Sequence, residues 1–258
     1  AGYLATPLNL VAGAKVMGYV LNHCKAELVF CAPESRALVE EAATSLTQNL
    51  RIIELHPEEG PIWPEDMQAA AVQDFQFAEA NSPGILMYTS GTTGNPKGVV
   101  LSHANLLSAG QNVAIAHHLD TQDIGCCVLP IYHINGLCVT IMGTIVSGGG
   151  LIMPYRFSLS RFWQDIKTHR ASWFSAVPTL FAYLLNDDNV PEIDKGRLRF
   201  SRSASAPLAP EIHRQFEARF GIPIIETMGL TETGAQILSN PLPPQTRKIG
   251  SPGIAIGN

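Results

Sequence analysis

Apolar and polar residues follow two different spacings along this chain, and the spacings predict short strands separated by amphipathic helices. Apolar runs such as AELVFC at 26–31 and RIIEL at 51–55 indicate buried strands. In the segment 9–23 apolar residues recur every three or four positions, which predicts a helix. Its buried face is expected to carry Ala12, Val16, Tyr19, Val20 and His23. The alternation of strand and helix is typical of an α/β fold with layered, mostly parallel sheets and flanking helices.

The same pattern predicts the order of the elements. The expected strands are 26–31, 51–55, 84–90, 98–102, 124–129, 150–153, 171–175, 198–202 and 222–226. The expected helices are 9–23, 34–47, one opened by Ser102 as N-cap, one from about 136, 158–169, 178–185 and 209–220. Prolines and scattered acids make 56–83 an expected surface connection. Neither a linker nor a fixed-period repeat divides the sequence, so we expect 1–258 to belong to one large domain.

Composition and charge narrow the class of protein. A chain with 46% hydrophobic and 15% charged residues is expected to be globular. A net charge of −5 without a Lys/Arg cluster argues against a nucleic-acid partner. The apolar stretch 136–154 contains glycines and polar residues, so we expect a buried helix, a turn and a strand there rather than a membrane span. Because no signal peptide opens the sequence, the expected location is cytoplasmic.

The cysteines show no sign of a metal site. Cys24, Cys31, Cys126, Cys127 and Cys138 form no CxxC pair and no Cys/His spacing suited to zinc. We therefore expect reduced, mostly buried thiols, which suits a reducing compartment.

The strongest chemical signal is the string YTSGTTGNPKGVV at 88–100, which joins two expected strands. Its glycines let backbone N–H groups approach an anion, its hydroxyls add donors, and Lys97 adds positive charge. The string is not a Walker A loop, because Pro96 stands where that motif has its second glycine and Gly98 follows the lysine. An ordinary turn would not need so many hydroxyls on an apolar chain. The sequence therefore predicts a loop that binds a polyphosphate.

This string resembles the phosphate loop of the adenylate-forming superfamily, which includes acyl-CoA synthetases, luciferases and the adenylation domains of peptide synthetases. Three more segments follow in the family's order. PIYHINGL (130–137) resembles the segment beside the acyl pocket, SRSASAPL (201–208) the segment along the adenine, and TMGLTET (227–233) the YGxTE motif. The resemblance covers nearly the whole chain. It implies a partial N-terminal domain of the adenylate-forming fold, with the small C-terminal domain absent.

The resemblance also implies a role for each matching residue. The ATP phosphates would be held by Ser90, Gly91, Thr92, Thr93, Gly94 and Lys97. Adenine would be contacted by Ser205, Ala206, Pro207, Met228 and Gly229. The resemblance places His133 where the acid meets the α-phosphate, with Tyr132 beside it, and lets Thr231 donate to that phosphate. Glu232 would hold Mg²⁺. Without the other motifs, His133 would be interpreted as a core histidine and the Thr-Glu pair as the start of a helix. The functional assignments therefore depend on the order of the motifs.

The implied reaction needs ATP, Mg²⁺ and coenzyme A. A small-molecule carboxylate would attack the α-phosphate to give an acyl-AMP and pyrophosphate, and the acyl group would then pass to the thiol of coenzyme A or of a carrier protein. Catalysis would rest on His133, Lys97, Thr231 and Glu232. The family's TGD motif and terminal lysine-bearing domain do not occur in 1–258. We therefore expect this chain alone to bind nucleotide weakly and not to turn over.

The acid and the acceptor stay open. SRSASAPLAP and SNPLPP resemble the branch with oxalate–CoA ligases and related small-acid or medium-chain ligases, but Asn135 stands where the oxalate enzymes tend to carry histidine. An amino-acid adenylation domain is disfavoured, because 130–160 contains no Asp to hold an ammonium group. A non-catalytic nucleotide-binding module stays an alternative to the enzyme, with slight support from Met228, which replaces the family's aromatic residue that stacks on adenine, and from the missing ends. Methionine still packs on a flat ring. The sequence does not determine the oligomeric state.

Overall fold

The computed structural model describes residues 2–64, 77–90 and 94–257. The chain folds into two compact units, Ala1–Val100 and Leu101–Asn258. The boundary between them falls inside a strand, β5 (Lys97–Ser102). The sequence predicts no division here, because the glycines and the proline just before this point belong to the predicted phosphate loop.

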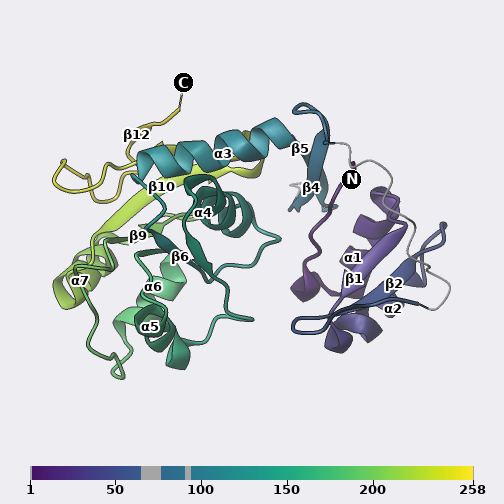
Figure 1. Cartoon of the computed structure of the whole chain (residues 1–258), viewed down its shortest axis with the longest axis horizontal. Helices are drawn as coiled ribbons and strands as arrows, with labels where there is room; N and C mark the ends of the chain where they lie inside the picture. Colours follow the sequence, from purple (N-terminus) through teal and green to yellow (C-terminus); the bar gives the residue numbers. More distant parts are fainter. Residues whose placement is uncertain (1, 65–76, 91–93, 258) are drawn as a thin grey trace. The chain divides into compact units, whose positions relative to one another are not determined.

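The first unit places two helices against a small sheet (Figure 1). Its described elements are η1 (Leu10–Ala12), α1 (Gly13–His23), β1 (Leu28–Cys31), η2 (Pro33–Ser35), α2 (Arg36–Ala43), β2 (Arg51–His56), β3 (Gly60–Ile62), β4 (Pro83–Thr89) and the start of β5. β1 and β2 are parallel, β3 is antiparallel to β2, and β4 pairs with β5 in a separate two-stranded sheet. The sequence predicted these strands except β3.

The buried face of α1 differs from the predicted one. The helix buries Met17, Gly18, Val20 and Leu21, so only Val20 of the expected set is buried. A Cβ on Gly18 would lie 2.8 Å from the carbonyl oxygen of Ala42, so glycine allows α1 and α2 to pack closely. His23 is exposed instead, and its Nδ1 lies 2.7 Å from the hydroxyl of Tyr88. Packing between the two helices therefore decides which face of α1 is buried.

The second unit is built on a seven-stranded sheet in the order β12-β11-β10-β9-β8-β6-β7. Its helices are α3 (His103–Ala116), η3 (Asn135–Met142, a π-helix), α4 (Gly143–Ser147), α5 (Leu159–Thr168), α6 (Pro178–Leu185), α7 (Pro210–Phe220) and the single turn η4 (Thr231–Thr233). Its strands are β6 (Ile124–Cys127), β7 (Gly150–Ile152), β8 (Trp173–Ala176), β9 (Phe200–Ser203), β10 (Ile224–Leu230), β11 (Ala235–Ser239) and β12 (Ile254–Ala255). The strands β7, β6, β8, β9 and β10 are parallel, whereas β11 and β12 are antiparallel additions.

Helices cover both faces of this sheet, with α5, α6 and α7 on one side and α3 and α4 on the other (Figure 1). Strand alternation divides the buried side chains between the two faces. The larger core, which includes Trp163, Phe174 and Phe216, lies under α5–α7. Trp173, Phe200 and Ile225 form the core on the opposite face. The predicted mostly parallel α/β arrangement is confirmed.

Local sequence signals explain several boundaries. Ser102 caps α3 as predicted, since its hydroxyl accepts from the Asn105 amide while the Asn105 side chain accepts from the Ser102 amide. The helix predicted at 178–185 has those bounds. The sequence missed β11 and β12, which are short edge strands whose pairing depends on β10.

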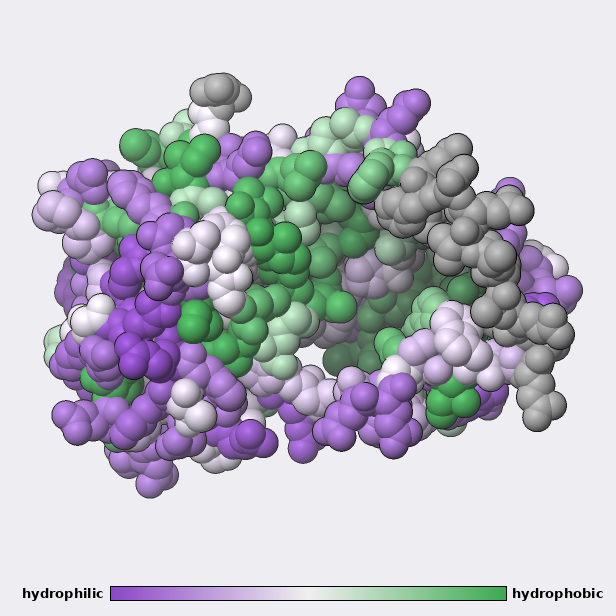
Figure 2. All heavy atoms as spheres, viewed as in Figure 1, coloured by the Kyte–Doolittle hydropathy of each residue, from purple (hydrophilic) through white to green (hydrophobic). Residues whose placement is uncertain are grey.

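The surface of the protein carries apolar as well as polar side chains. Some large apolar side chains remain exposed, and Figure 2 shows such residues as green areas between hydrophilic ones. The five cysteines are unpaired, and all except the half-buried Cys24 are buried, as expected. Within the described ranges, every helix is too short or too polar to cross a bilayer.

Candidate active site

Three of the four predicted motifs follow parallel strands of the second unit. The segment 130–137 follows β6, 204–208 follows β9, and 227–233 comprises the end of β10 and the turn η4. Because parallel strands end at the same edge of a sheet, these segments lie at one edge. A direct contact joins two of them, since the Asn135 side-chain amide donates to the hydroxyl of Ser205 at 3.3 Å.

His133 lies in the first segment, just before the π-helix η3. Its backbone N–H donates to the carbonyl of Pro130 at 3.1 Å, and its ring lies 4.7 Å from the ring of Tyr132. The turn needs glycine at 136, because a Cβ there would lie 2.5 Å from the Pro130 oxygen. Partial desolvation lowers the pKa of His133, which favours the neutral imidazole, although the residue as a whole is exposed. It can therefore offer a hydrogen bond without a charge.

The predicted adenine segment is exposed at Ser205, Ala206 and Pro207. Ser205 has φ of 72°, in the left-handed region that non-glycine residues rarely adopt. Such a conformation costs on the order of 1 kcal/mol, and the hydrogen bond from Asn135 helps to hold it. The segment therefore presents a fixed, accessible backbone at the end of β9.

The last motif turns sharply after β10. The pairing of β10 with β11 shifts register between Met228 and Gly229, and Met228 is 42% exposed. A Cβ on Gly229 would lie 1.8 Å from the carbonyl oxygen of Ala235, so no other residue fits. The hydroxyl of Thr233 is used within the turn, since it accepts from the Leu230 amide at 3.1 Å.

Thr231 and Glu232 remain available for a ligand. Among the described residues, neither side chain has a hydrogen-bond or ion-pair partner, and Glu232 is exposed. No cluster of three or more His, Cys, Asp or Glu side chains within these residues could enclose a metal ion. A single carboxylate fits Mg²⁺, which proteins commonly bind through one or two carboxylates together with substrate phosphates.

The predicted phosphate loop belongs to the first unit, between β4 and β5. Gly91, Thr92 and Thr93 lie outside the described residues, whereas Ser90, Gly94 and Lys97 are described and exposed. Gly94 has φ of 99°, which requires glycine. Within the described part of the chain the Lys97 amine has no hydrogen-bond or ion-pair partner. Its positive charge is thus available to an anion.

Sequence reasoning missed a buried polar cluster beside His133. Arg202, in the middle of β9, is only 1% exposed and donates four hydrogen bonds. Its Nη1 donates to Ser175 Oγ at 2.8 Å and to Asn135 Oδ1 at 3.2 Å. Its Nη2 donates to Thr227 Oγ1 at 2.7 Å and to Gln236 Oε1 at 2.5 Å. An arginine within an expected buried strand was the available signal, because such a charge is rarely buried without a reason.

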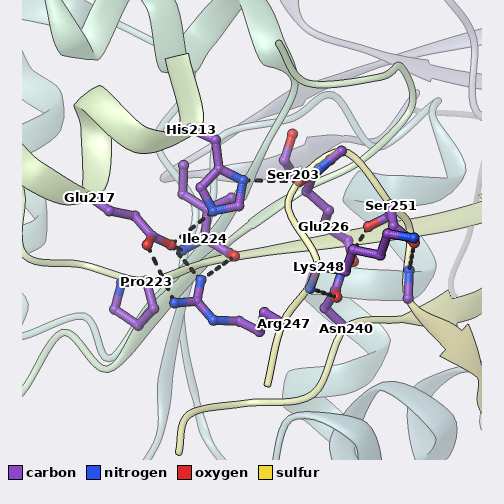
Figure 3. A network of polar contacts seen from close by, with 12 residues as sticks. Ser203, His213, Glu217, Pro223, Ile224, Glu226, Asn240, Arg247, Lys248 and Ser251 are labelled. Atoms are coloured by element: carbon purple, nitrogen blue, oxygen red, sulfur yellow. Dashed lines mark hydrogen bonds and ion pairs between the residues drawn. The ribbon is translucent and has the colours of Figure 1, made fainter. Parts of the chain in front are cut away.

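A second network of polar contacts lies on the face of β10 opposite to Arg202 (Figure 3). The ring of His213, on α7, lies between two carboxylates, with Nε2 2.9 Å from Glu217 and Nδ1 3.0 Å from Glu226. Arg247 also bonds Glu217, and the amide of Gly250 donates to Glu226 at 2.7 Å. Burial alone raises the pKa of Glu217, but these hydrogen bonds outweigh it and lower the pKa to about 2. The network ties the segment after β11 to the strand that carries the last motif.

The sequence profile of the AMP-binding enzyme family matches residues 1–258, so the chain belongs to this family of adenylate-forming enzymes. It is 45% identical to a sulfoacetate–CoA ligase of Cupriavidus necator over 99% of this chain and 50% of the relative. It is 33% identical to an oxalate–CoA ligase of Arabidopsis thaliana over 98% of this chain and 51% of the relative. Among solved structures, ATP-bound MatB from Rhodopseudomonas palustris is similar, with a TM-score of 0.80 and 28% identity over 98% of this chain and 50% of that one.

These comparisons confirm the predicted superfamily and its oxalate–CoA ligase-like branch. They also confirm the fold as part of an N-terminal domain of adenylate-forming enzymes. The chain spans about half the length of the curated relatives it matches.

Proposed function

We propose that the protein containing this chain is an AMP-forming acid–CoA ligase, and that 1–258 belongs to its large N-terminal domain. The observation that supports the proposal is the hydrogen bond from Asn135 to Ser205, which joins the segments after β6 and β9. The Thr231–Glu232 turn follows β10, the next strand of the same sheet. Open α/β sheets bind ligands outside the carboxyl ends of their strands. The curated relatives at 45% and 33% identity are named for acid–CoA ligation, which supports the same reaction class.

The proposed first step is attack of a substrate carboxylate oxygen on the α-phosphorus of ATP. A new P–O bond forms, the bond to the bridging oxygen of the β-phosphate breaks, and pyrophosphate leaves. Lys97 and the hydroxyls of Ser90, Thr92 and Thr93 would hold the phosphates, with Gly91 and Gly94 allowing close approach. Donors placed in this way stabilise the charge that develops in the transition state, which is commonly the main source of catalysis.

The second unit would supply the acid and nucleoside contacts. Neutral His133 would hydrogen-bond the reacting oxygens, and Thr231 would donate to the α-phosphate. Ser205, Ala206, Pro207, Met228 and Gly229 would hold the adenine. Mg²⁺ on Glu232 would neutralise phosphate charge. In the second step the thiol of coenzyme A would attack the acyl carbon, and AMP would leave. A reducing cytoplasmic setting suits the five free thiols.

Acid-dependent exchange of labelled pyrophosphate into ATP by the full-length protein tests the proposal. We expect exchange with short acids such as sulfoacetate, oxalate and malonate, and release of AMP when coenzyme A is added. ATP binding without exchange with any acid would instead support a non-catalytic module. Exchange only with amino acids, followed by loading of a carrier protein, would identify a carrier-linked adenylation domain.

A further inference from the structure

Arg202 is a buried cation whose described partners are all neutral. Its four hydrogen-bond acceptors are the side-chain oxygens of Asn135, Ser175, Thr227 and Gln236. Among the described residues no carboxylate forms an ion pair with it. The carboxylate of Glu226, on the next strand, points to the opposite face of the sheet and bonds His213. Within this part of the chain, the buried positive charge therefore has no anion beside it.

Such an arrangement is costly unless an anion completes it. A buried charge without an opposite charge beside it strongly destabilises a fold unless hydrogen bonds compensate it. Burial lowers the pKa of Arg202 to about 9, which still leaves the guanidinium charged at pH 7. The neighbouring His117, also fully buried, cannot share the charge, since burial and the charge of Arg202 lower its pKa to about 3.

The cluster also holds hydrogen-bond donors that lack acceptors. Arg202 Nε and Gln236 Nε2 are both buried without a partner in the described structure. The orientation of the Gln236 amide follows from its contact, because only its oxygen can accept from Arg202. Unpaired donors around one cation fit a ligand that brings acceptor oxygens and negative charge.

The position of the cluster relates it to the acid. Asn135, two residues after His133, accepts from Arg202 and donates to Ser205 of the adenine segment. The cluster thus lies behind the place where the proposed reaction brings acid and nucleotide together. Because Arg202 is only 1% exposed, we expect a substrate group to displace the Asn135 oxygen from Arg202 while the Asn135 amide keeps its bond to Ser205.

We propose that Arg202 determines specificity by binding a second anionic group, a carboxylate or a sulfonate, at the far end of a short acid substrate. This inference rests on the proposed acid–CoA ligase function. The guanidinium suits either group, because each brings negative charge and acceptor oxygens, and Arg202 Nε has no acceptor in the described structure. Because Asn135 lies two residues after His133 and contacts Arg202, we expect an acid with few carbons between its two charged ends.

The test compares acids that differ only in the second charge. Pyrophosphate exchange by the full-length protein is measured with sulfoacetate, malonate and oxalate, and with acetate and propionate as singly charged counterparts. The variants are Arg202→Met, which keeps the length of the side chain, and Arg202→Lys, which keeps the charge without the fork. Arg199→Met is the matched control, because Arg199 lies directly before the same strand but pairs with Asp123 at 2.7 Å.

We expect the unmodified enzyme to prefer a doubly charged acid, with sulfoacetate and malonate distinguishing sulfonate from carboxylate recognition. Arg202→Met should lower kcat/KM for that acid by roughly 100-fold or more, chiefly through KM, and change singly charged acids by less than about threefold. The kcat/KM of Arg202→Lys for the doubly charged acid should lie between those of the unmodified enzyme and Arg202→Met. Arg199→Met should keep the preference for the doubly charged acid. Thermal stabilisation by the preferred acid without ATP should also disappear in Arg202→Met.

Three results would overturn the inference. If Arg202→Met lowered kcat/KM by the same factor for every acid, Arg202 would have a structural role only. An unmodified enzyme that activates singly and doubly charged acids alike would also contradict it, whether or not Arg202→Met folds. The inference would also be contradicted if Arg202→Lys kept the full preference for doubly charged acids while Arg202→Met lowered the melting temperature. Absence of exchange with every acid would contradict the proposed function itself.

Discussion

The side-chain amide of Asn135 donates a hydrogen bond to the hydroxyl of Ser205 at 3.3 Å, although 70 positions separate the two residues. Through this bond the segment after β6 is joined to the segment after β9 at one edge of the sheet. The oxygen of the same amide accepts from Ser175 at 2.9 Å and from Arg202. Asn135 therefore positions the exposed reacting segments through buried contacts.

Asn135→Ala should lower the free energy of unfolding by about 1–3 kcal/mol, because Arg202 and Ser175 lose a buried acceptor. It should also raise KM for both ATP and the acid, since Ser205 loses its support. Denaturant unfolding and pyrophosphate exchange measure the two effects. Asn186→Ala is the control: its amide donates to the Ala182 carbonyl at an exposed helix end, and its effect should stay within about 0.5 kcal/mol. Equal effects of the two substitutions would contradict the prediction.

Gly229→Ala should disrupt the turn after β10, because the added Cβ would lie 1.8 Å from the Ala235 oxygen. Relief of such an overlap requires backbone movement, with an expected loss of about 1–3 kcal/mol of stability. Adenylation should fall with it, since Thr231 and Glu232 follow directly. Gly196→Ala, where the nearest atom would be a side-chain oxygen at 3.3 Å, should leave both quantities nearly unchanged. Normal exchange activity in Gly229→Ala would show that the turn tolerates displacement.

Glu232→Gln should raise the Mg²⁺ concentration needed for half-maximal pyrophosphate exchange, because the amide has lost the charge that binds a hard cation. The fold should be unaffected, since the carboxylate is exposed and has no partner within the described residues. Glu211→Gln, an exposed acid near Arg214 on α7, serves as control and should keep the Mg²⁺ dependence of the parent. Identical Mg²⁺ curves for Glu232→Gln and the parent would exclude Glu232 as the ligand.

Acidification should weaken the second unit through His117. Burial, with a further contribution from Arg202, lowers the pKa of His117 from 6.5 to about 3 in the folded state. The unfolded chain therefore binds a proton that the folded chain excludes, and stability is lost as pH falls from 6.5 towards 3. Melting temperatures of His117→Phe should decline less between pH 7 and pH 5 than those of the parent. The exposed His169→Gln should follow the parent, and parallel curves for all three proteins would contradict the assignment.

Part of the site was predictable because it depends on local order. The strings at 130–137 and 227–233 follow strands whose hydrophobic pattern is clear, so their position at strand ends could be expected. The buried face of α1 could not, because a close approach to Ala42 at Gly18 selects it over the face that periodicity favours. Helical spacing predicts which residues share a face of a helix, and packing against a neighbouring helix determines which face is buried.

Spacing along the chain was enough to predict the α/β class, the family and the identity of the motif residues. Two features are visible in the folded chain alone. Asn135 joins Ser205 to Arg202, and Arg202 lies buried with neutral partners from four separate strands and helices. Those partners range from position 135 to 236, and no local pattern relates them. The parallel pairing of β8, β9 and β10 places Ser175, Arg202 and Thr227 on a common face. The antiparallel strand β11 adds Gln236, and the helix η3 adds Asn135.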